Sequence, residues 1–226
     1  MMSKVKATGL MLATLVVFAA CKKDEVVAID TTNNGTFKVY TTGNITTVQN
    51  LVADTIVGLN AITGQPYGSG RFSFFSLETG TAIPASDSAT TKWDIAFRGT
   101  TILTNAGVSG PGSGGGFVQI GTFDNFNTIS ADSTFRRDSI PGRYAITSGS
   151  NRGWYTYDGA NNLITPLPGR VLVFRTATGK YAKLEITNYY KGGSTPATSA
   201  SDATKLKEQR YYNFRFTYQP NGSKNF

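Results

Sequence analysis

Residues 169–190, GRVLVFRTATGKYAKLEITNYY, constrain the fold of this chain more than any other stretch. The segment begins with an apolar run, VLVF, which is typical of a strand covered on both faces. The turn TATG then supplies Gly179, which can adopt a positive φ at little cost. After the turn, the residues alternate with a period of two. Ala182 and Leu184 fall on one face, and Lys183 falls on the other, which is expected to face solvent. The segment therefore predicts a β-hairpin.

The last strand-like segment, residues 211–218, repeats this alternation. Tyr212, Phe214 and Phe216 fall on one face of the expected strand, and Arg215 falls on the other. An aromatic row of this kind is suited to packing across a core, while its polar neighbours face water. The two segments together predict a sheet with one buried aromatic face.

Several shorter segments also have the composition of strands. In one of them the aromatic positions change phase between Phe74 and Phe75, which indicates a β-bulge. In another, Trp93 and Ile95 share one expected face. Residues 200–210 predict one short polar helix. The remaining strand-like segments are 36–41, 46–57, 71–77 and 92–97. The chain is therefore expected to form one all-β domain.

The N-terminus has the features of a bacterial lipoprotein signal. A short basic start precedes an apolar run that ends in AAC, so residues 1–20 are expected to be removed and Cys21 to be lipidated. The following KKDE resembles the lipoprotein export signal of Bacteroidetes, which directs proteins to the outer face of the outer membrane. Residues 21–36 are then a tether, and residues 37–226 form the β domain. The alternative is a plain signal peptide with an incidental cysteine.

The amino-acid composition argues against most enzyme classes. There is no histidine, and the three methionines, Met1, Met2 and Met11, all lie in the predicted signal. Catalytic triads and the usual zinc sites depend on histidine, so neither is expected here, and no metal site is predicted. Pairs of carboxylates remain possible as acids and bases, although none lies in a recognisable motif and surface solubility accounts for most of them. The candidate acids are Asp94, Asp124, Asp132, Asp138 and Asp158.

Three further features suggest anion binding, and each has another explanation. The formal net charge is +8, but the basic residues are singly spaced along alternating strands, so nucleic acid is not an expected partner. The glycine-rich segment 107–116 contains GPGSGG, but a strand rather than a helix is expected behind it. We therefore expect a flexible loop there. Arg136 and Arg137 could grip an anionic ligand or simply form a charged turn.

The order of several motifs resembles that of a known family. The lipobox, KWDIAF, GWYTYD, the predicted hairpin and the closing YYNFRFTYQ together are similar to the HmuY family of Bacteroidetes haem-binding lipoproteins. The resemblance implies an all-β fold of two opposed antiparallel sheets with finger-like extensions that hold the porphyrin. It also implies haem capture outside the cell and delivery to a TonB-dependent outer-membrane receptor.

The resemblance does not extend to the ligands of the haem iron. Family members use histidine or methionine, and the mature chain has neither, so the axial ligands are left unassigned. Tyrosinate ligation by Tyr144, Tyr155 or Tyr157 is chemically possible, and arginines could pair with the propionates. The candidate ligand-binding residues are Arg98, Phe123, Phe126, Arg136, Arg137, Tyr144 and Tyr155. The alternative function is an accessory or interaction lipoprotein that has the same fold and binds no haem.

Overall fold

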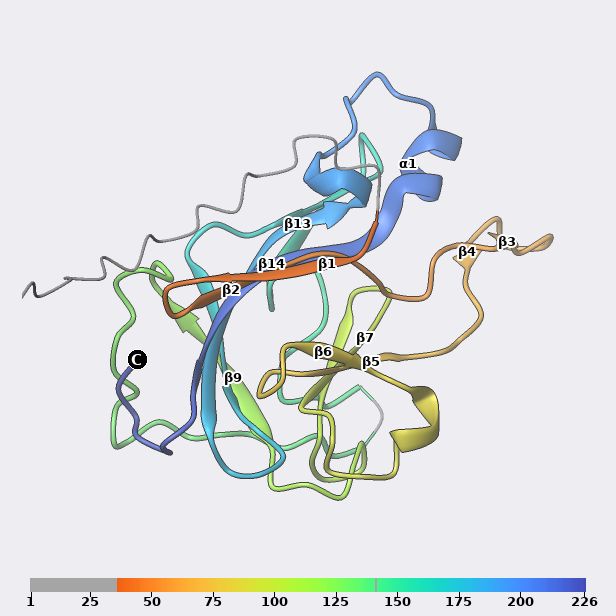
Figure 1. The fold of residues 1–226 in the computed structure, drawn as a ribbon. Helices are drawn as coiled ribbons and strands as arrows, with labels where there is room; N and C mark the ends of the chain where they lie inside the picture. Colours follow the sequence, from red (N-terminus) through yellow and green to blue (C-terminus); the bar gives the residue numbers. More distant parts are fainter. Residues whose placement is uncertain (1–35, 141) are drawn as a thin grey trace, which may run out of the picture.

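The computed structural model describes residues 36–140 and 142–226 and shows two antiparallel sheets that face each other (Figure 1). The predicted signal peptide, the lipidated Cys21 and the tether up to residue 35 lie outside the described residues. Within the described part of the chain, no helix is long and apolar enough to cross a membrane. The all-β prediction with two opposed sheets is confirmed.

The larger sheet has six strands in the order β1-β2-β14-β13-β12-β9, and every neighbouring pair is antiparallel. The hairpin predicted at residues 169–190 forms β12 and β13, two adjacent interior strands of this sheet, with Leu172 opposite Leu184. The bounds of the six strands are β1 Lys38–Thr42, β2 Ile45–Val52, β9 Gly115–Ile120, β12 Arg170–Arg175, β13 Tyr181–Tyr190 and β14 Gln209–Gln219.

The smaller sheet has four strands in the order β6-β5-β7-β8, and two separate two-stranded hairpins, β3-β4 and β10-β11, complete the fold. Figure 1 shows β3 and β4 projecting away from both sheets, below the helix labelled α1. The bounds are β3 Gly58–Leu59, β4 Pro66–Tyr67, β5 Ser73–Ser76, β6 Thr81–Ile83, β7 Ile95–Arg98, β8 Thr101–Thr104, β10 Tyr155–Asp158 and β11 Leu163–Pro166. The helical segments are η1 Ala85–Asp87, η2 Lys191–Gly193 and α1 Asp202–Glu208.

The main core lies between the two sheets. The predicted aromatic row of β14 is buried there, and the Phe75 ring from β5 meets Phe214 and Phe216 edge-on at centroid distances of 5.5 and 6.0 Å. Phe97 from β7 lies 4.5 Å from the ring of Tyr212. Edge-to-face aromatic packing adds to the gain from apolar burial, so this row joins the two sheets.

The opposite face of the larger sheet is also covered, which the sequence did not predict. Lys183 was expected in solvent, but it is only 4% exposed and its Nζ donates to the carbonyl oxygens of Phe123 (3.0 Å) and Phe126 (2.8 Å). Val171 and Val173 pack against Phe123 on the same face. The loop after β9 therefore forms a second layer over the sheet.

The outer face of the smaller sheet carries a third apolar cluster, which corrects two expectations. Phe74 packs here against Trp93, with ring centroids 4.9 Å apart, whereas Phe75 lies in the main core. The change of phase therefore reflects burial of both faces of β5, and the pairing of β5 shows no bulge. Trp93 and Ile95 lie in different clusters, because β7 begins only at Ile95.

The glycine-rich segment is packed rather than loose. The Gly112 amide donates to Asn105 Oδ1 at 2.9 Å, and a Cβ at Gly112 would lie 2.7 Å from the Asn105 carbonyl oxygen. Glycine is needed there because the backbones approach closely. As predicted, a strand follows the segment, since β9 begins at Gly115, so it has no helix N-terminus to bind phosphate.

A candidate ligand cleft between two hairpins

A cleft of about 540 Å³ lies between the two hairpins and the helix that precedes β14. This volume is within the range of small-molecule sites, about 300–1,000 Å³. Its walls come from the β3-β4 hairpin, the β10-β11 hairpin and α1, and its floor comes from β13, β14 and the turn after β7. The lining residues are Leu59, Gly64, Gln65, Pro66, Gly99, Thr100, Tyr157, Asn162, Ile164, Tyr189, Asp202, Lys205, Leu206, Gln209 and Arg210.

The β3-β4 wall exposes large hydrophobic side chains. Leu59, which lines the cleft, is 55% exposed, and Val57, Ile62 and Tyr67 on the same hairpin are at least half exposed. Only two residue pairs join β3 to β4, so the hairpin buries little of its own apolar surface. A cluster of exposed apolar side chains on a projecting element is typical of a binding surface.

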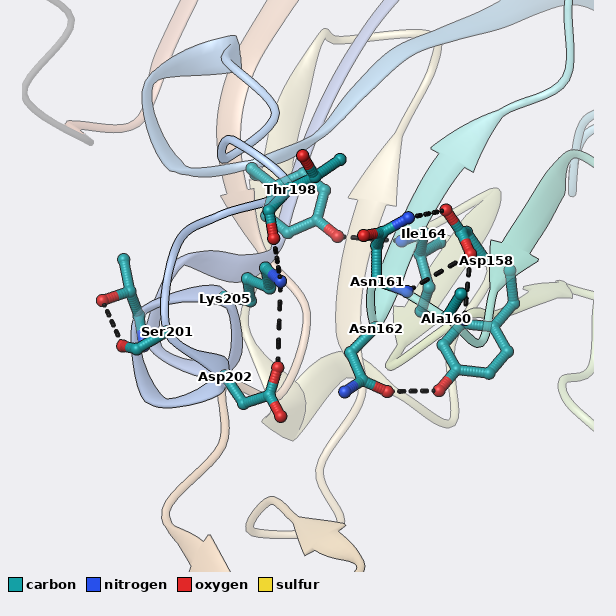
Figure 2. A network of polar contacts seen from close by, with 12 residues as sticks. Asp158, Ala160, Asn161, Asn162, Ile164, Thr198, Ser201, Asp202 and Lys205 are labelled. Carbon is teal, nitrogen blue, oxygen red and sulfur yellow. Dashed lines mark hydrogen bonds and ion pairs between the residues drawn. The ribbon is translucent and has the colours of Figure 1, made fainter.

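The β10-β11 wall presents Tyr157, and its turn is fixed by side-chain hydrogen bonds (Figure 2). The Tyr157 hydroxyl donates to Asn162 Oδ1 at 2.8 Å. Asp158 Oδ1 accepts from the Ala160 amide, and its Oδ2 accepts from Asn161 Nδ2 at 2.7 Å. These bonds, the one from Asn161 Nδ2 first, lower the pKa of Asp158. The turn is thus fixed with Tyr157 on its cleft side.

The α1 wall contributes a basic side chain. Lys205 Nζ donates to the Thr198 carbonyl oxygen at 2.8 Å and lies 3.8 Å from Asp202 Oδ1. Figure 2 marks both contacts with dashed lines. The helix begins at the N-cap Ser201, whose side chain accepts from the Thr204 amide. These contacts fix the Lys205 ammonium in place, and its stem adds apolar surface to the wall.

The tyrosines at and beneath the floor of the cleft are buried. Tyr189 lines the cleft but is only 1% exposed, and burial raises its pKa far above the ordinary value. Burial has the same effect on the pKa of Tyr212 beneath it. A buried phenol stays protonated because the phenolate loses its hydration. Tyr157, which is 48% exposed, is thus the tyrosine lining the cleft that can present a phenol oxygen to a ligand.

The base of the β3-β4 hairpin is held by Asp54. Its Oδ1 accepts from the Ser69 hydroxyl at 2.7 Å, and its Oδ2 accepts from the Gly70 amide at 3.0 Å. Arg210, on the floor of the cleft, donates from Nη1 to the Asp54 carbonyl oxygen at 2.7 Å. The two ends of the hairpin are therefore joined to each other and to the cleft floor.

The predicted ligand-binding residues do not form one site. Arg98 stacks on Phe72, with its guanidinium 4.3 Å from the ring centroid, and donates to the Gly70 carbonyl oxygen. Phe123 and Phe126 lie in the layer over the larger sheet, where they pack around Lys183. None of these residues lines the cleft.

The other predicted residues occupy two further places. Arg136, Arg137 and Tyr144 line a separate hollow. Tyr155 is 8% exposed and packs in the main core against Trp154, beneath the cleft. Sequence reasoning missed Leu59 and Arg210, because a two-residue strand pair gives no alternation and a single arginine after a short helix gives no motif.

Two of the candidate acids are structural. Both carboxylate oxygens of Asp94 accept backbone amides, from Ala177 at 2.8 Å and from Leu77 at 2.7 Å. Asp138 accepts in the same way from Thr104 at 2.8 Å and Ala145 at 2.7 Å. Burial raises the pKa of both carboxyls. These two residues connect separate segments of the chain, so surface solubility does not explain them. Among the described residues, no three carboxylate, histidine or cysteine side chains gather as a metal site.

The fold and the cleft define an all-β protein of two opposed sheets whose hairpin extensions flank a ligand-sized cavity. The HmuY protein family model matches residues 70–200, more than half of the sequence, and the chain belongs to the HmuY family. No curated protein matches the chain. The family match spans the β10-β11 hairpin, whereas the β3-β4 hairpin lies before the matched residues and α1 and β14 lie after them.

Three of the solved structures that are similar to this chain show the extent of the match. A protein from Bacteroides vulgatus designated as HmuY-like and haem-binding has 17% identity and a TM-score of 0.41, and the match covers 66% of this chain and 85% of that one. A protein designated as a lipoprotein from Bacteroides fragilis has 15% identity and a TM-score of 0.45, with coverages of 81% and 96%. An apo HmuY analogue from Tannerella forsythia has 16% identity and a TM-score of 0.42, with coverages of 82% and 97%.

Proposed function

We propose that this protein binds haem or a related tetrapyrrole in the cleft between β3-β4 and β10-β11 and does not transform it. The observation that carries the proposal is the exposed apolar wall at Leu59, facing a cavity of about 540 Å³ that also contains Tyr157, Lys205 and Arg210. A flat apolar ring with two carboxylates needs apolar surface for its faces and cations for its edge. The cleft supplies the apolar surface, and its cations are Lys205 and Arg210, which also pair with Asp202 and Asp54.

The side chains available in the cleft favour binding of the porphyrin ring over coordination of its iron. The sequence has no histidine and no methionine beyond Met11, and Tyr157 is the oxygen ligand that the cleft offers to iron. Burial of the porphyrin faces and pairing of the propionates with cations do not involve the metal. Iron-free protoporphyrin should therefore bind nearly as tightly as haem.

The proposed location follows from the N-terminal sequence. Lipidation of Cys21 would hold the protein on the outer membrane, and the acidic residues after it would direct it to the cell surface. Residues up to 35 then separate the β domain from the membrane. From this position the protein would capture a tetrapyrrole and deliver it to a TonB-dependent receptor, a role that family membership supports.

Titration of the soluble domain with haem and with protoporphyrin, followed by absorbance, tests the proposal. The domain should bind both ligands saturably, and Leu59→Asp should weaken both by about tenfold or more, because it places a carboxylate against an apolar ring. Ile120→Asp is the matched control, since Ile120 is 64% exposed and does not line the cleft. Absence of saturable binding of either ligand would refute the proposal.

A second candidate function is an interaction protein that docks on a receptor or another surface protein. Ile62, at the end of the β3-β4 hairpin, is 95% exposed, and Val57 is 65% exposed, yet neither lines the cleft. Exposed apolar side chains outside the cavity suit a protein partner. This function is favoured if neither porphyrin binds.

A further inference from the structure

A second hollow, which shares no lining residue with the cleft, is surrounded by arginines. It has a volume of about 480 Å³ and lies where the segment between β9 and β10 folds back on itself. Four of its eight lining residues are Arg136, Arg137, Arg143 and Arg152, and Ser139 and Thr147 add hydroxyls. Among the residues that the structure describes, no acidic one lines it.

The described part of the chain places no ion-pair partner on the arginines of this hollow. Over residues 36–140 and 142–226, the ion pairs that form involve other basic side chains, namely Lys92, Lys205, Arg210 and Arg215. Asp138 is adjacent in sequence, but it is 1% exposed and both of its oxygens accept backbone amides in the interior. Like charges gathered without a counter-ion cost free energy, which binding of an anion recovers.

Two of the four guanidiniums are held in position by neutral acceptors. Arg136 Nη2 donates to the Ala145 carbonyl oxygen at 2.6 Å and to Thr147 Oγ1 at 3.0 Å. Arg137 Nη2 donates to the Gly112 carbonyl oxygen at 3.2 Å. Each guanidinium retains other N–H donors, which can form bidentate bonds to an oxyanion. Arg143 and Arg152 make no such bond within the described residues and complete the rim.

We propose that this hollow binds a small anion with at least two phosphate-type groups, such as a diphosphate or a bisphosphorylated sugar headgroup. One phosphate group pairs with about two arginines in bidentate geometry, so four arginines match two groups. The volume of about 480 Å³ also exceeds what a single oxyanion would fill. The site is independent of the tetrapyrrole cleft, so the two proposals can fail separately.

Calorimetric titration of the soluble domain with pyrophosphate and with orthophosphate tests this inference. Pyrophosphate should bind at one site per chain, more tightly than orthophosphate, and its affinity should fall as salt rises. Arg143→Gln combined with Arg152→Gln should weaken pyrophosphate binding by about tenfold or more, the loss expected for one or two charge-assisted hydrogen bonds. These two side chains hold no backbone group, so the variant should fold normally.

The matched control replaces basic residues elsewhere on the surface. Arg71→Gln combined with Lys207→Gln removes the same charge from exposed positions outside the hollow and should leave pyrophosphate affinity within about twofold. Equal weakening by both double variants would mean that only net charge matters and would overturn the site. Failure of pyrophosphate to bind saturably would also overturn it.

Sedimentation with vesicles distinguishes a lipid headgroup from a free ligand as the source of the phosphate groups. Vesicles containing phosphatidylinositol bisphosphate present two phosphomonoesters on one lipid headgroup, and phosphatidylcholine vesicles are the neutral control. Co-sedimentation with the first alone, displaced by pyrophosphate and lost in the Arg143→Gln, Arg152→Gln variant, supports a lipid headgroup as the source. Binding of pyrophosphate without co-sedimentation supports a free ligand.

Discussion

The guanidinium of Arg210 donates a 2.7 Å hydrogen bond to the carbonyl oxygen of Asp54, and both residues have a positive φ, 70° for Arg210 and 62° for Asp54. Residues other than glycine rarely adopt this conformation, which costs free energy unless the surroundings fix it. Here the two strained positions meet at the base of the β3-β4 hairpin, on the floor of the cleft. This contact determines how the hairpin wall stands relative to the floor.

The first prediction concerns how the stability of the β3-β4 hairpin, at the end held by Asp54, depends on pH. Burial acts to raise the pKa of Asp54, but hydrogen bonds from Ser69 and Gly70, together with Arg210, lower it overall. A carboxyl whose pKa is lower in the folded state stabilises the fold above its unfolded pKa, about 3.9, and this stabilisation is lost as pH falls through the folded value. Exchange of the Gly70 amide, corrected for its intrinsic rate, should therefore accelerate below about pH 4.

The control for this prediction is Asp54→Asn, which cannot titrate. In this variant the Gly70 amide should exchange faster at neutral pH and show no further acceleration in acid. The same acid acceleration in the variant as in the wild type would assign the effect to another carboxyl.

The second prediction compares the two faces of β14. Phe216→Ala removes a core side chain that is 2% exposed and should lower the free energy of unfolding by about 3–5 kcal/mol. Arg215→Ala should cost about 1–2 kcal/mol, because Arg215 bonds both oxygens of Asp124 at 3.0 Å and its guanidinium lies 4.4 Å from the Phe123 ring centroid. From sequence alone, a solvent-facing Arg215 would cost about 0.5 kcal/mol or less. Urea unfolding distinguishes these values.

The third prediction concerns the buried lysine. Lys183→Met keeps the aliphatic stem but leaves the carbonyl oxygens of Phe123 and Phe126 without their donor, so it should destabilise the domain by about 1–3 kcal/mol. Lys207→Met, at an exposed position, should change stability by about 0.5 kcal/mol or less. If both variants unfold at the same urea concentration, the layer over the larger sheet does not depend on Lys183.

The fourth prediction tests the anchor. Cys21→Ser should move the protein from the membrane fraction to the soluble fraction, because lipidation requires the thiol. Replacement of Asp24 and Glu25 with alanine should leave it anchored but reduce its cleavage by protease added outside the cells. Retention of Cys21→Ser in the membrane would contradict the lipoprotein assignment.

The fold could be predicted wherever one strand carried a regular signal. Alternation gave the β12-β13 hairpin, and the aromatic row of β14 gave the face that meets the smaller sheet. The same alternation misplaced Lys183, because a period of two shows that the faces differ and does not show what covers the polar one. The covering loop around Phe123 comes from residues far away in the sequence.

The candidate site was much harder to predict. The cleft depends on hairpins with little periodicity, and its residues lie between Leu59 and Arg210, so no local motif joins them. The adjacent Arg136 and Arg137 were recognised as possible anion ligands, but their neighbours Arg143 and Arg152 are brought to the same hollow only by the folding of the intervening segment. A binding site whose side chains come from separate segments gives no local motif in a single sequence.

The location of the tetrapyrrole is the central claim, and Trp154 can report on it. Trp154 Nε1 donates to the Thr100 carbonyl oxygen at 3.0 Å, and its ring lies 5.4 Å from that of Tyr189, while Thr100 and Tyr189 both line the cleft. The other tryptophan, Trp93, lies in the cluster on the outer face of the smaller sheet. The Trp93→Phe variant therefore leaves a single tryptophan, directly beneath the proposed site.

The most direct measurement is quenching of Trp154 fluorescence in the Trp93→Phe protein by iron-free protoporphyrin, after circular dichroism has shown that the variant is folded. Binding in the cleft predicts saturable quenching at one porphyrin per chain, with an affinity reduced about tenfold or more when Leu59→Asp is added. Quenching that does not saturate, or an affinity that Leu59→Asp leaves unchanged, would contradict a tetrapyrrole site in this cleft.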